Sequence, residues 1–101
     1  MRIISGTLGG RIITVPKNFK ARPTTDIARE GLFNILSNRY DFDNMTVLDL
    51  FSGTGSVSME FYSRGVSQLT SVELSTMHVS FIKKNMQELG ITGTKIICGN
   101  V

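Results

Sequence analysis

Residues 47–56, Val47-Leu48-Asp49-Leu50-Phe51-Ser52-Gly53-Thr54-Gly55-Ser56, decide the fold. In them an apolar run leads directly into two closely spaced glycines, and a helical pattern follows at once. Glycine suits such a turn because it adopts positive φ angles and, having no Cβ, lets the backbone approach a ligand closely. The backbone N–H groups that begin the next helix then face that ligand. This stretch predicts a strand, a ligand-binding turn and a helix.

The same alternation continues to the end of the sequence. Gly65 and Gly90 each stand just past a helical pattern, and Ser75 is a good N-cap for the second one. Strands and helices that alternate through short connections predict an α/β fold with a parallel, doubly wound sheet. We expect the first and third strands to be buried, with Cys98 in the core. The predicted elements are strand 45–50, helix 56–64, strand 69–74, helix 76–89 and strand 95–98.

A different pattern precedes this alternation. Two β-branched runs, 2–4 and 11–15, flank a segment of turn residues and predict a β-hairpin. After a loop over 16–24, a helix is expected from Thr24 or Thr25 to about Asn38, because either threonine is a suitable N-cap. We therefore divide the chain into a basic N-terminal part, 1–44, and the first half of a Rossmann-like domain, 45–101. The helix places on one face Ala28, Leu32, Phe33, Ile35 and Leu36.

Charge is distributed unevenly along the 101 residues, whose net charge is +3. Residues 1–40 contain seven Lys or Arg and two acidic residues, a net charge of +5, whereas residues 41–101 contain four and six, a net charge of −2. A basic arm beside a nearly neutral domain is typical of nucleic-acid binding, although a solvated surface that binds nothing has the same composition. Charge alone therefore names no partner.

The remaining composition excludes several classes of protein. No apolar run approaches the roughly 20 residues of a membrane span, and the N-terminus has no apolar signal segment. One cysteine cannot form an internal disulfide and fits a reducing compartment. One cysteine and one histidine cannot build a structural zinc site, so no metal is expected. We expect a cytoplasmic protein that does not contact a membrane.

Two acidic residues narrow the choice of ligand. Glu73 follows Gly53 by 20 residues at the end of the second predicted strand, the spacing of an acid that accepts the ribose hydroxyls of an adenosine-containing cofactor. The third glycine of the dinucleotide pattern is absent, and Asp49 stands just before the turn, where a carboxylate is unfavourable beside a pyrophosphate. S-adenosylmethionine, with its ammonium and sulfonium groups, is favoured. A nicotinamide- or flavin-binding domain stays open, as does an Asp49 that only caps the turn.

The sequence resembles the N-terminal portion of a known family, the RsmD-type bacterial 16S ribosomal RNA (guanine-N2) methyltransferases. The glycine turn marks only the wider class of methyltransferases, while the segment 22–36 is the most specific part, because few other methyltransferases carry it. The resemblance extends over nearly the whole chain. It is carried by Arg2-Ile3-Ile4-Ser5-Gly6, Gly10-Arg11, Arg22-Pro23-Thr24-Thr25-Asp26, Arg29-Glu30-Gly31-Leu32-Phe33-Asn34-Ile35-Leu36, the stretch 48–56, Glu60, Ser63-Arg64-Gly65 and Val72-Glu73.

The resemblance implies a cofactor and roles for individual residues. It implies a Rossmann-like methyltransferase fold that binds S-adenosylmethionine at the glycine turn and uses 16S ribosomal RNA of the small subunit as its substrate. The implied cofactor-binding residues are Asp49, Phe51, Gly53, Gly55, Glu73, Asn100 and Thr25, where Asn100 stands in place of the acidic residue that usually contacts adenine. The implied RNA-binding residues are Arg2, Arg11, Arg22 and Arg29.

One family motif is absent from these 101 residues. The resemblance implies an Asn/Asp-Pro-Pro-aromatic motif after a fourth strand that holds the guanine amine, whereas the prolines here are Pro16 and Pro23. We therefore expect a chain truncated after its third strand, inactive alone, with its catalytic motif beyond Val101. The uncovered sheet edge would then favour self-association. A non-enzymatic RNA-binding module remains an alternative to methylation of guanine N2.

Overall fold

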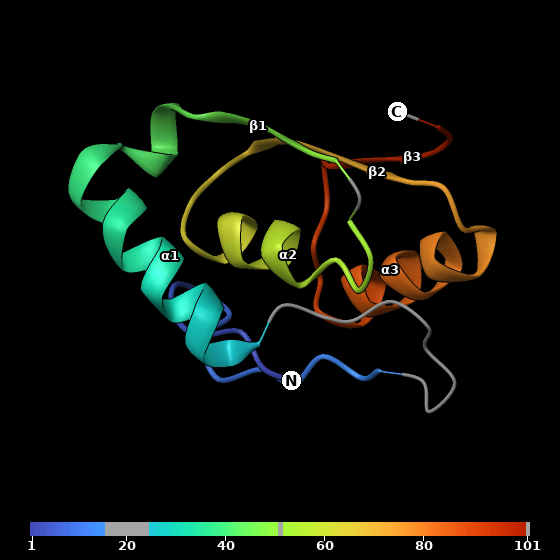
Figure 1. Cartoon of the computed structure of the whole chain (residues 1–101), viewed down its shortest axis with the longest axis horizontal. Coiled ribbons are helices and arrows are strands. Elements are labelled where there is room, and N and C mark those ends of the chain that lie inside the picture. Colours follow the sequence, from blue (N-terminus) through green and yellow to red (C-terminus); the bar gives the residue numbers. More distant parts are fainter. Residues whose placement is uncertain (16–24, 51, 101) are drawn as a thin grey trace.

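A parallel three-stranded sheet is the centre of the molecule, in a computed structural model that describes residues 1–15, 25–50 and 52–100. Its strands β1 (Thr46–Asp49), β2 (Gln68–Glu73) and β3 (Lys95–Cys98) are adjacent in the order β1-β2-β3. Helices α2 (Ser56–Ser63) and α3 (Thr76–Glu88) connect them and lie on one face of the sheet (Figure 1). Both lie there because each right-handed crossover moves the chain in the same direction. The predicted α/β, Rossmann-like fold is confirmed.

The opposite face of the sheet carries no helix of the described chain, as Figure 1 shows. Leu48 is 61% exposed and Ile97 is 49% exposed, so the prediction that their strands are buried is wrong. Both strands lie at sheet edges, and only alternate side chains, such as Val47, face α2. Cys98, expected in the core, is exposed for the same reason.

Helix α1 (Asp26–Arg39) begins as predicted, because Thr25 is its N-cap and accepts a hydrogen bond from the Ala28 N–H. Its buried face differs from the predicted one. Arg29 and Phe33 are fully buried, whereas Ile35 is 56% exposed. Counting apolar residues therefore missed the buried face, since an arginine occupies one of its positions. A short 3-10 helix, η1 (Phe42–Asn44), leads from α1 to β1.

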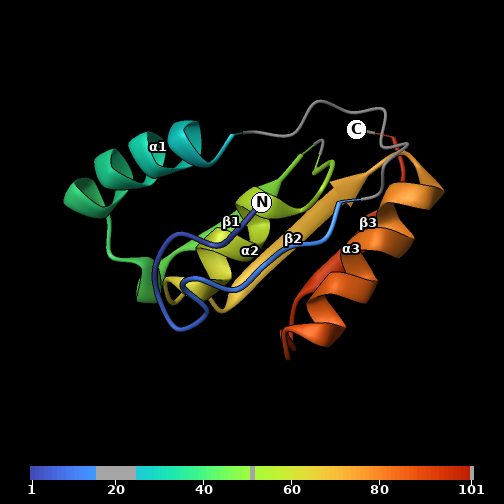
Figure 2. The same ribbon diagram turned by 90° about the horizontal axis from the view of Figure 1, so that it is seen from below.

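The predicted hairpin forms a third layer beneath α2 and α3, on the side away from the sheet (Figure 2). Its pairing is short: a single antiparallel bridge joins Arg2 to Ile12, supported by hydrogen bonds such as Ile3 N–H to the Arg11 carbonyl at 2.9 Å. Ile3 and Ile13 are 0% and 1% exposed. They pack with residues of α2 and α3, so the hairpin contributes to the same core as the Rossmann-like part.

Helix α2 lies between two apolar clusters. Met59 belongs to the cluster that Ile3, Ile13 and Ile82 also join. Phe61, two residues later, packs edge-on against Phe33 of α1, with ring centroids 4.6 Å apart. Because adjacent α2 side chains contact different layers, this helix has almost no exposed side. It holds the hairpin, α1 and the sheet together and so positions the turn at its own N-terminus.

Candidate functional site

The glycine turn lies where β1 ends and α2 begins. Gly53 and Gly55 have φ angles of 58° and 77°, in the left-handed region that only glycine adopts readily. A Cβ at Gly55 would lie 3.1 Å from Ile82 and 3.2 Å from Met59, so this residue also allows α3 to approach closely. Both glycines thus shape the turn through their backbone conformation, and at Gly55 close packing is a second cause.

Glu73, at the end of β2, contacts this turn directly. Its Oε1 accepts a hydrogen bond from the Gly53 N–H at 2.7 Å, and its Oε2 accepts one from the Ser75 N–H at 2.9 Å. His78 Nδ1 lies 3.4 Å from Oε2. Burial alone would raise the pKa of Glu73, but the N–H groups of Ser75 and Gly53 and the nearby His78 outweigh it, so that the pKa lies below its ordinary value. Glu73 is therefore ionised at neutral pH.

Asp49, at the end of β1, is the second carboxylate of the site. Its Oδ2 accepts a hydrogen bond from the Ser58 hydroxyl of α2, which in turn accepts one from Ser71 at 2.7 Å. Burial raises the pKa of Asp49, and the charge of Glu73 adds to this, while hydrogen bonds from Ser58 and Ser52 act in the opposite direction. Sequence reasoning missed Ser58 and Ser71, since isolated serines carry no spacing signal.

Neither carboxylate of this pair is neutralised by Lys or Arg in the described part of the chain. The salt bridges found there join neither Asp49 nor Glu73 to Lys or Arg, and His78 is the group that pairs with Glu73. Two carboxylates at the carboxyl ends of adjacent parallel strands lie where open α/β sheets bind ligands. Such a site favours a ligand that brings positive charge and hydroxyl donors.

The other predicted cofactor residues are only partly placed. Asn100 is exposed and follows Gly99, whose N–H donates to the Glu73 carbonyl at 3.1 Å, so it lies close to the end of β2. Thr25 is exposed and caps α1. Phe51 lies outside the described residues.

The predicted RNA-binding arginines separate into two groups. Arg2 and Arg11 of the hairpin are exposed and available to a phosphate. Arg29 is fully buried: its Nη2 donates to Asp26 and to the Arg2 carbonyl, and its Nη1 lies 3.3 Å from Glu60. The structure therefore gives Arg29 an internal role and argues against contact with RNA. Arg22 lies outside the described residues.

Glu60 is the centre of a buried charged cluster that sequence reasoning underestimated. It is 0% exposed and accepts hydrogen bonds from the Ile4 N–H at 2.8 Å, the Ser5 N–H at 3.1 Å and Arg64 Nε at 2.8 Å, besides its contact with Arg29. One carboxylate thus joins α2 to the hairpin and to α1. A glutamate within a helix carries no sign of this role until the chain is folded.

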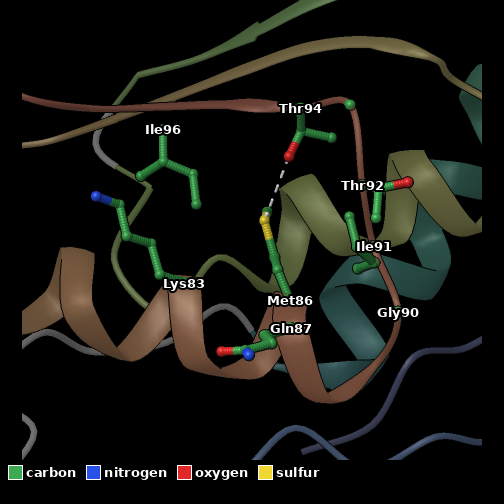
Figure 3. Close-up of a pocket in the computed structure, with 9 residues that line it drawn as sticks. Lys83, Met86, Gln87, Gly90, Ile91, Thr92, Thr94 and Ile96 are labelled. Atoms are coloured by element: carbon green, nitrogen blue, oxygen red, sulfur yellow. Dashed lines mark hydrogen bonds between the residues drawn. The ribbon is translucent and has the colours of Figure 1, made fainter.

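A cavity of about 380 Å³ lies away from these carboxylates (Figure 3). It lies between the C-terminal half of α3 and the beginning of β3, where Thr94 Oγ1 donates to Met86 Sδ at 3.6 Å. This is the amino end of β3, opposite to the strand ends that carry Asp49 and Glu73. Its lining includes Lys83, Met86, Gln87, Ile91, Thr94 and Ile96.

Comparison with known proteins supplies the family. The model of the family described as Conserved hypothetical protein 95 matches residues 1–100. The chain belongs to this family, the RsmD family. Ribosomal RNA small subunit methyltransferase D of Buchnera aphidicola (subspecies Acyrthosiphon pisum) is 40% identical over 98 residues, which are 97% of this chain and 50% of that protein. The enzyme of the same name from Escherichia coli K12 is 33% identical over 99% of this chain and 50% of its own length.

A solved structure shares the fold of this chain. A hypothetical protein of Thermus thermophilus matches with a TM-score of 0.85 and 30% identity, over 100% of this chain and 56% of that chain. The present chain spans about half the length of the curated relatives that it matches.

No helix of the described residues is long and apolar enough to cross a membrane. Within the same residues, no group of three His, Cys, Asp or Glu side chains is arranged to hold a metal ion.

Proposed function

We propose that this RsmD-family chain provides the S-adenosylmethionine-binding half of a methyltransferase that modifies guanine N2 in 16S ribosomal RNA. The observation that carries the proposal is the contact between Glu73 and the Gly53 N–H at 2.7 Å, which joins the ends of β1 and β2 in one site. Ribosomal RNA as substrate is supported by the named function of the relatives, and it implies a cytoplasmic protein.

The side chains present fit this cofactor. A carboxylate offers about four acceptor positions, and Glu73 uses two of them for the N–H groups of Gly53 and Ser75. The remaining positions can accept both ribose hydroxyls. Asp49 supplies a negative charge for the ammonium and sulfonium groups, and Asn100 can both donate to and accept from the adenine edge. When bound, S-adenosylmethionine supplies an electrophilic methyl group; Asp49 and Glu73 hold and orient its carrier.

Positioning accounts for much of methyl transfer, because the amine nitrogen, the methyl carbon and the sulfur must be in line. The described residues provide the cofactor side of this alignment. No residue of this chain is proposed to hold the guanine amine, and the Asn/Asp-Pro-Pro-aromatic motif is not among its 101 residues. We therefore propose methyl transfer for a protein of the relatives' full length, about half of which this chain matches.

Calorimetric titration of the chain with S-adenosylmethionine, S-adenosylhomocysteine, NAD and FAD tests the cofactor. We expect binding of the first two alone. Binding of NAD or FAD without S-adenosylhomocysteine would overturn the proposal in favour of a dinucleotide-binding domain. Binding of RNA with no cofactor of any kind would favour a non-enzymatic module.

For RNA we propose contacts by the exposed Arg2 and Arg11, and by Arg22, which lies outside the described residues. The R2A/R11A double variant should bind a fragment of unmodified small-subunit ribosomal RNA more weakly, with a shallower dependence of affinity on salt, because fewer phosphates are neutralised. Arg39→Ala, which removes an exposed charge from the far end of α1, is the matched control. Equal losses in both proteins would indicate nonspecific attraction alone.

We also propose self-association through the open sheet face and the β1 edge, where Leu48, Leu50 and Ile97 are exposed. Leu48→Asp should shift the chain towards monomer in sedimentation velocity. Ile27→Asp is the control, because Ile27 is 84% exposed on α1. A monomeric wild-type chain at high concentration would refute this.

A further inference from the structure

We propose that Ser58, supported by Ser71, is a positioning residue that holds the Asp49 carboxylate in its ligand-facing orientation and takes the place of the third glycine of the Gly-x-Gly-x-x-Gly turn. The inference rests on the proposed cofactor function. It concerns how Asp49 is held rather than which ligand it meets, and it can be tested without a ligand.

The strand register brings the three side chains together. Asp49 of β1 and Ser71 of β2 are direct partners in the parallel pairing, so their side chains point to the same face of the sheet. Ser58, in the first turn of α2, lies over this pair, because the short turn 52–55 starts the helix directly above the end of β1. Three elements therefore converge on one carboxylate.

The hydrogen bonds of this group have a defined direction. Ser71 donates to Ser58 at 2.7 Å, and Ser58 donates to Asp49 Oδ2. A serine hydroxyl has one proton to donate and an oxygen that accepts. Ser58 gives its proton to Asp49, and its oxygen accepts the proton of Ser71. Hydrogen bonds in such a chain strengthen one another. Both serines are 0% exposed, so water does not replace either hydroxyl.

The position of Ser58 explains why a serine is tolerated there. Ser58 follows Gly53 and Gly55 at the spacing where dinucleotide-binding turns have a glycine that permits close packing of the helix on the strand. A side chain at this position is forced against the strands. Here it points a hydroxyl at the one carboxylate beneath it, and Asp49 is only partly buried and still reachable by a ligand.

Carbon-13 NMR titration of the Asp49 carboxyl in the ligand-free chain tests the inference directly. Ser58→Ala removes the donor to the ionised form, so the pKa of Asp49 should rise above that in the wild type. Ser71→Ala leaves that donor in place without its support and should give a smaller rise. Ser63→Ala is the matched control, because Ser63 is a buried α2 serine whose hydroxyl bonds the hairpin instead. A rise in Ser58→Ala no larger than in Ser63→Ala would overturn the inference.

Titration with S-adenosylhomocysteine over a range of pH adds a second readout. Ser58→Ala should lose roughly tenfold in affinity, and the loss should grow as pH falls, because Asp49 takes up its proton at a higher pH in the variant than in the wild type. A loss that is independent of pH and equal in Ser63→Ala would indicate a general structural effect and refute the positioning role. If the wild type binds no S-adenosylhomocysteine, the proposed function fails, while the NMR titration still decides whether Ser58 positions Asp49.

Discussion

Helix α2 contacts two clusters of charged side chains that differ in their balance. Around Glu60, the closed cluster combines Arg29, Arg64 and Asp26, two positive and two negative groups in mutual contact. Around the glycine turn, the open cluster combines Asp49 and Glu73, and His78 is its one potential cation among the residues that the structure describes. The closed cluster is internally neutral and the open one is acidic.

This difference distinguishes a cluster that stabilises the fold from a cluster that can bind a ligand. Charges that are fully buried are tolerated when they are paired and hydrogen-bonded, and removing one partner is costly. Carboxylates without a Lys or Arg partner, here the half-buried Asp49 and the buried Glu73, are instead typical of a site that binds a cationic ligand. The closed cluster joins the hairpin and α1 to α2, so that α2 in turn fixes the glycine turn. Substitutions at Glu60, Gly6, Glu73 and Asp49 test this division.

Glu60→Ala should have the largest effect on stability. It leaves the buried Arg29 with Asp26 as its one remaining carboxylate among the described residues, takes the carboxylate from the half-buried Arg64 and removes the acceptor of two hairpin N–H groups, at a cost of about 3–5 kcal/mol. Urea denaturation followed by circular dichroism measures this. Glu30→Ala, at an exposed position of α1, should change the unfolding free energy little. If both variants behave alike, the closed cluster is not what holds the layers together.

Gly6→Ala should follow, because the hairpin turn touches the end of α2 at this residue. Gly6 has a φ angle of 86°, and a Cβ there would lie 1.9 Å from the Ser63 carbonyl oxygen, so a cost of about 3 kcal/mol or more is expected. Gly10 has the same φ angle with nothing within 4 Å of the added Cβ. Gly10→Ala should therefore cost only the conformational strain, about 1–2 kcal/mol. Equal costs in thermal denaturation would contradict the role of this contact.

Glu73→Gln should affect binding more than folding. The variant retains one acceptor for the N–H groups of Gly53 and Ser75 but loses the charge that we assign to the ribose hydroxyls. Affinity for S-adenosylhomocysteine should fall roughly 10- to 100-fold in calorimetry, as for the loss of hydrogen bonds to a charged group. The unfolding free energy should fall less than in Glu60→Ala. A larger loss of stability than of affinity would show that Glu73 serves the fold rather than a ligand.

The smallest effect concerns the pH dependence of stability, where the two acids of the open cluster act in opposite directions. The lowered pKa of Glu73 stabilises the fold above the ordinary glutamate range, and this is lost as pH falls through the folded-state pKa. The raised pKa of Asp49 does the reverse: stability declines as pH rises from the ordinary aspartate range through the folded-state pKa.

Asp49→Asn should therefore be at least as stable as the wild type at neutral pH and should lose the cofactor. Glu73→Gln should instead be less stable than the wild type at neutral pH and should match it in acid. Urea denaturation at several pH values checks both signs. A decrease in the stability of Asp49→Asn at neutral pH would show that Asp49 serves the fold rather than a ligand.

The elements of this fold were predictable because their signals are local. Alternating apolar runs, the N-caps Thr25 and Ser75 and the glycines after α2 and α3 depend on a few neighbouring residues. All five elements from β1 to β3 lie within two residues of their predicted bounds. The 20-residue spacing from Gly53 to Glu73 also led to a real contact. The family resemblance implied that Arg29 contacts RNA, but Arg29 lies in the interior, because its partners come from elsewhere in the chain.

The order of strands and helices, the glycine turn and the family follow from the sequence alone. Which charges are neutralised depends on the folded layers, since Glu60 meets Arg29 and the hairpin across 31 and 56 residues of sequence. The tertiary structure also decides that Ser58 and Ser71 bear on Asp49, a contact that depends on the register between β1 and β2. The physical reason is the same in each case: backbone conformation follows from neighbouring residues, whereas burial and charge pairing follow from the layers that fold against them.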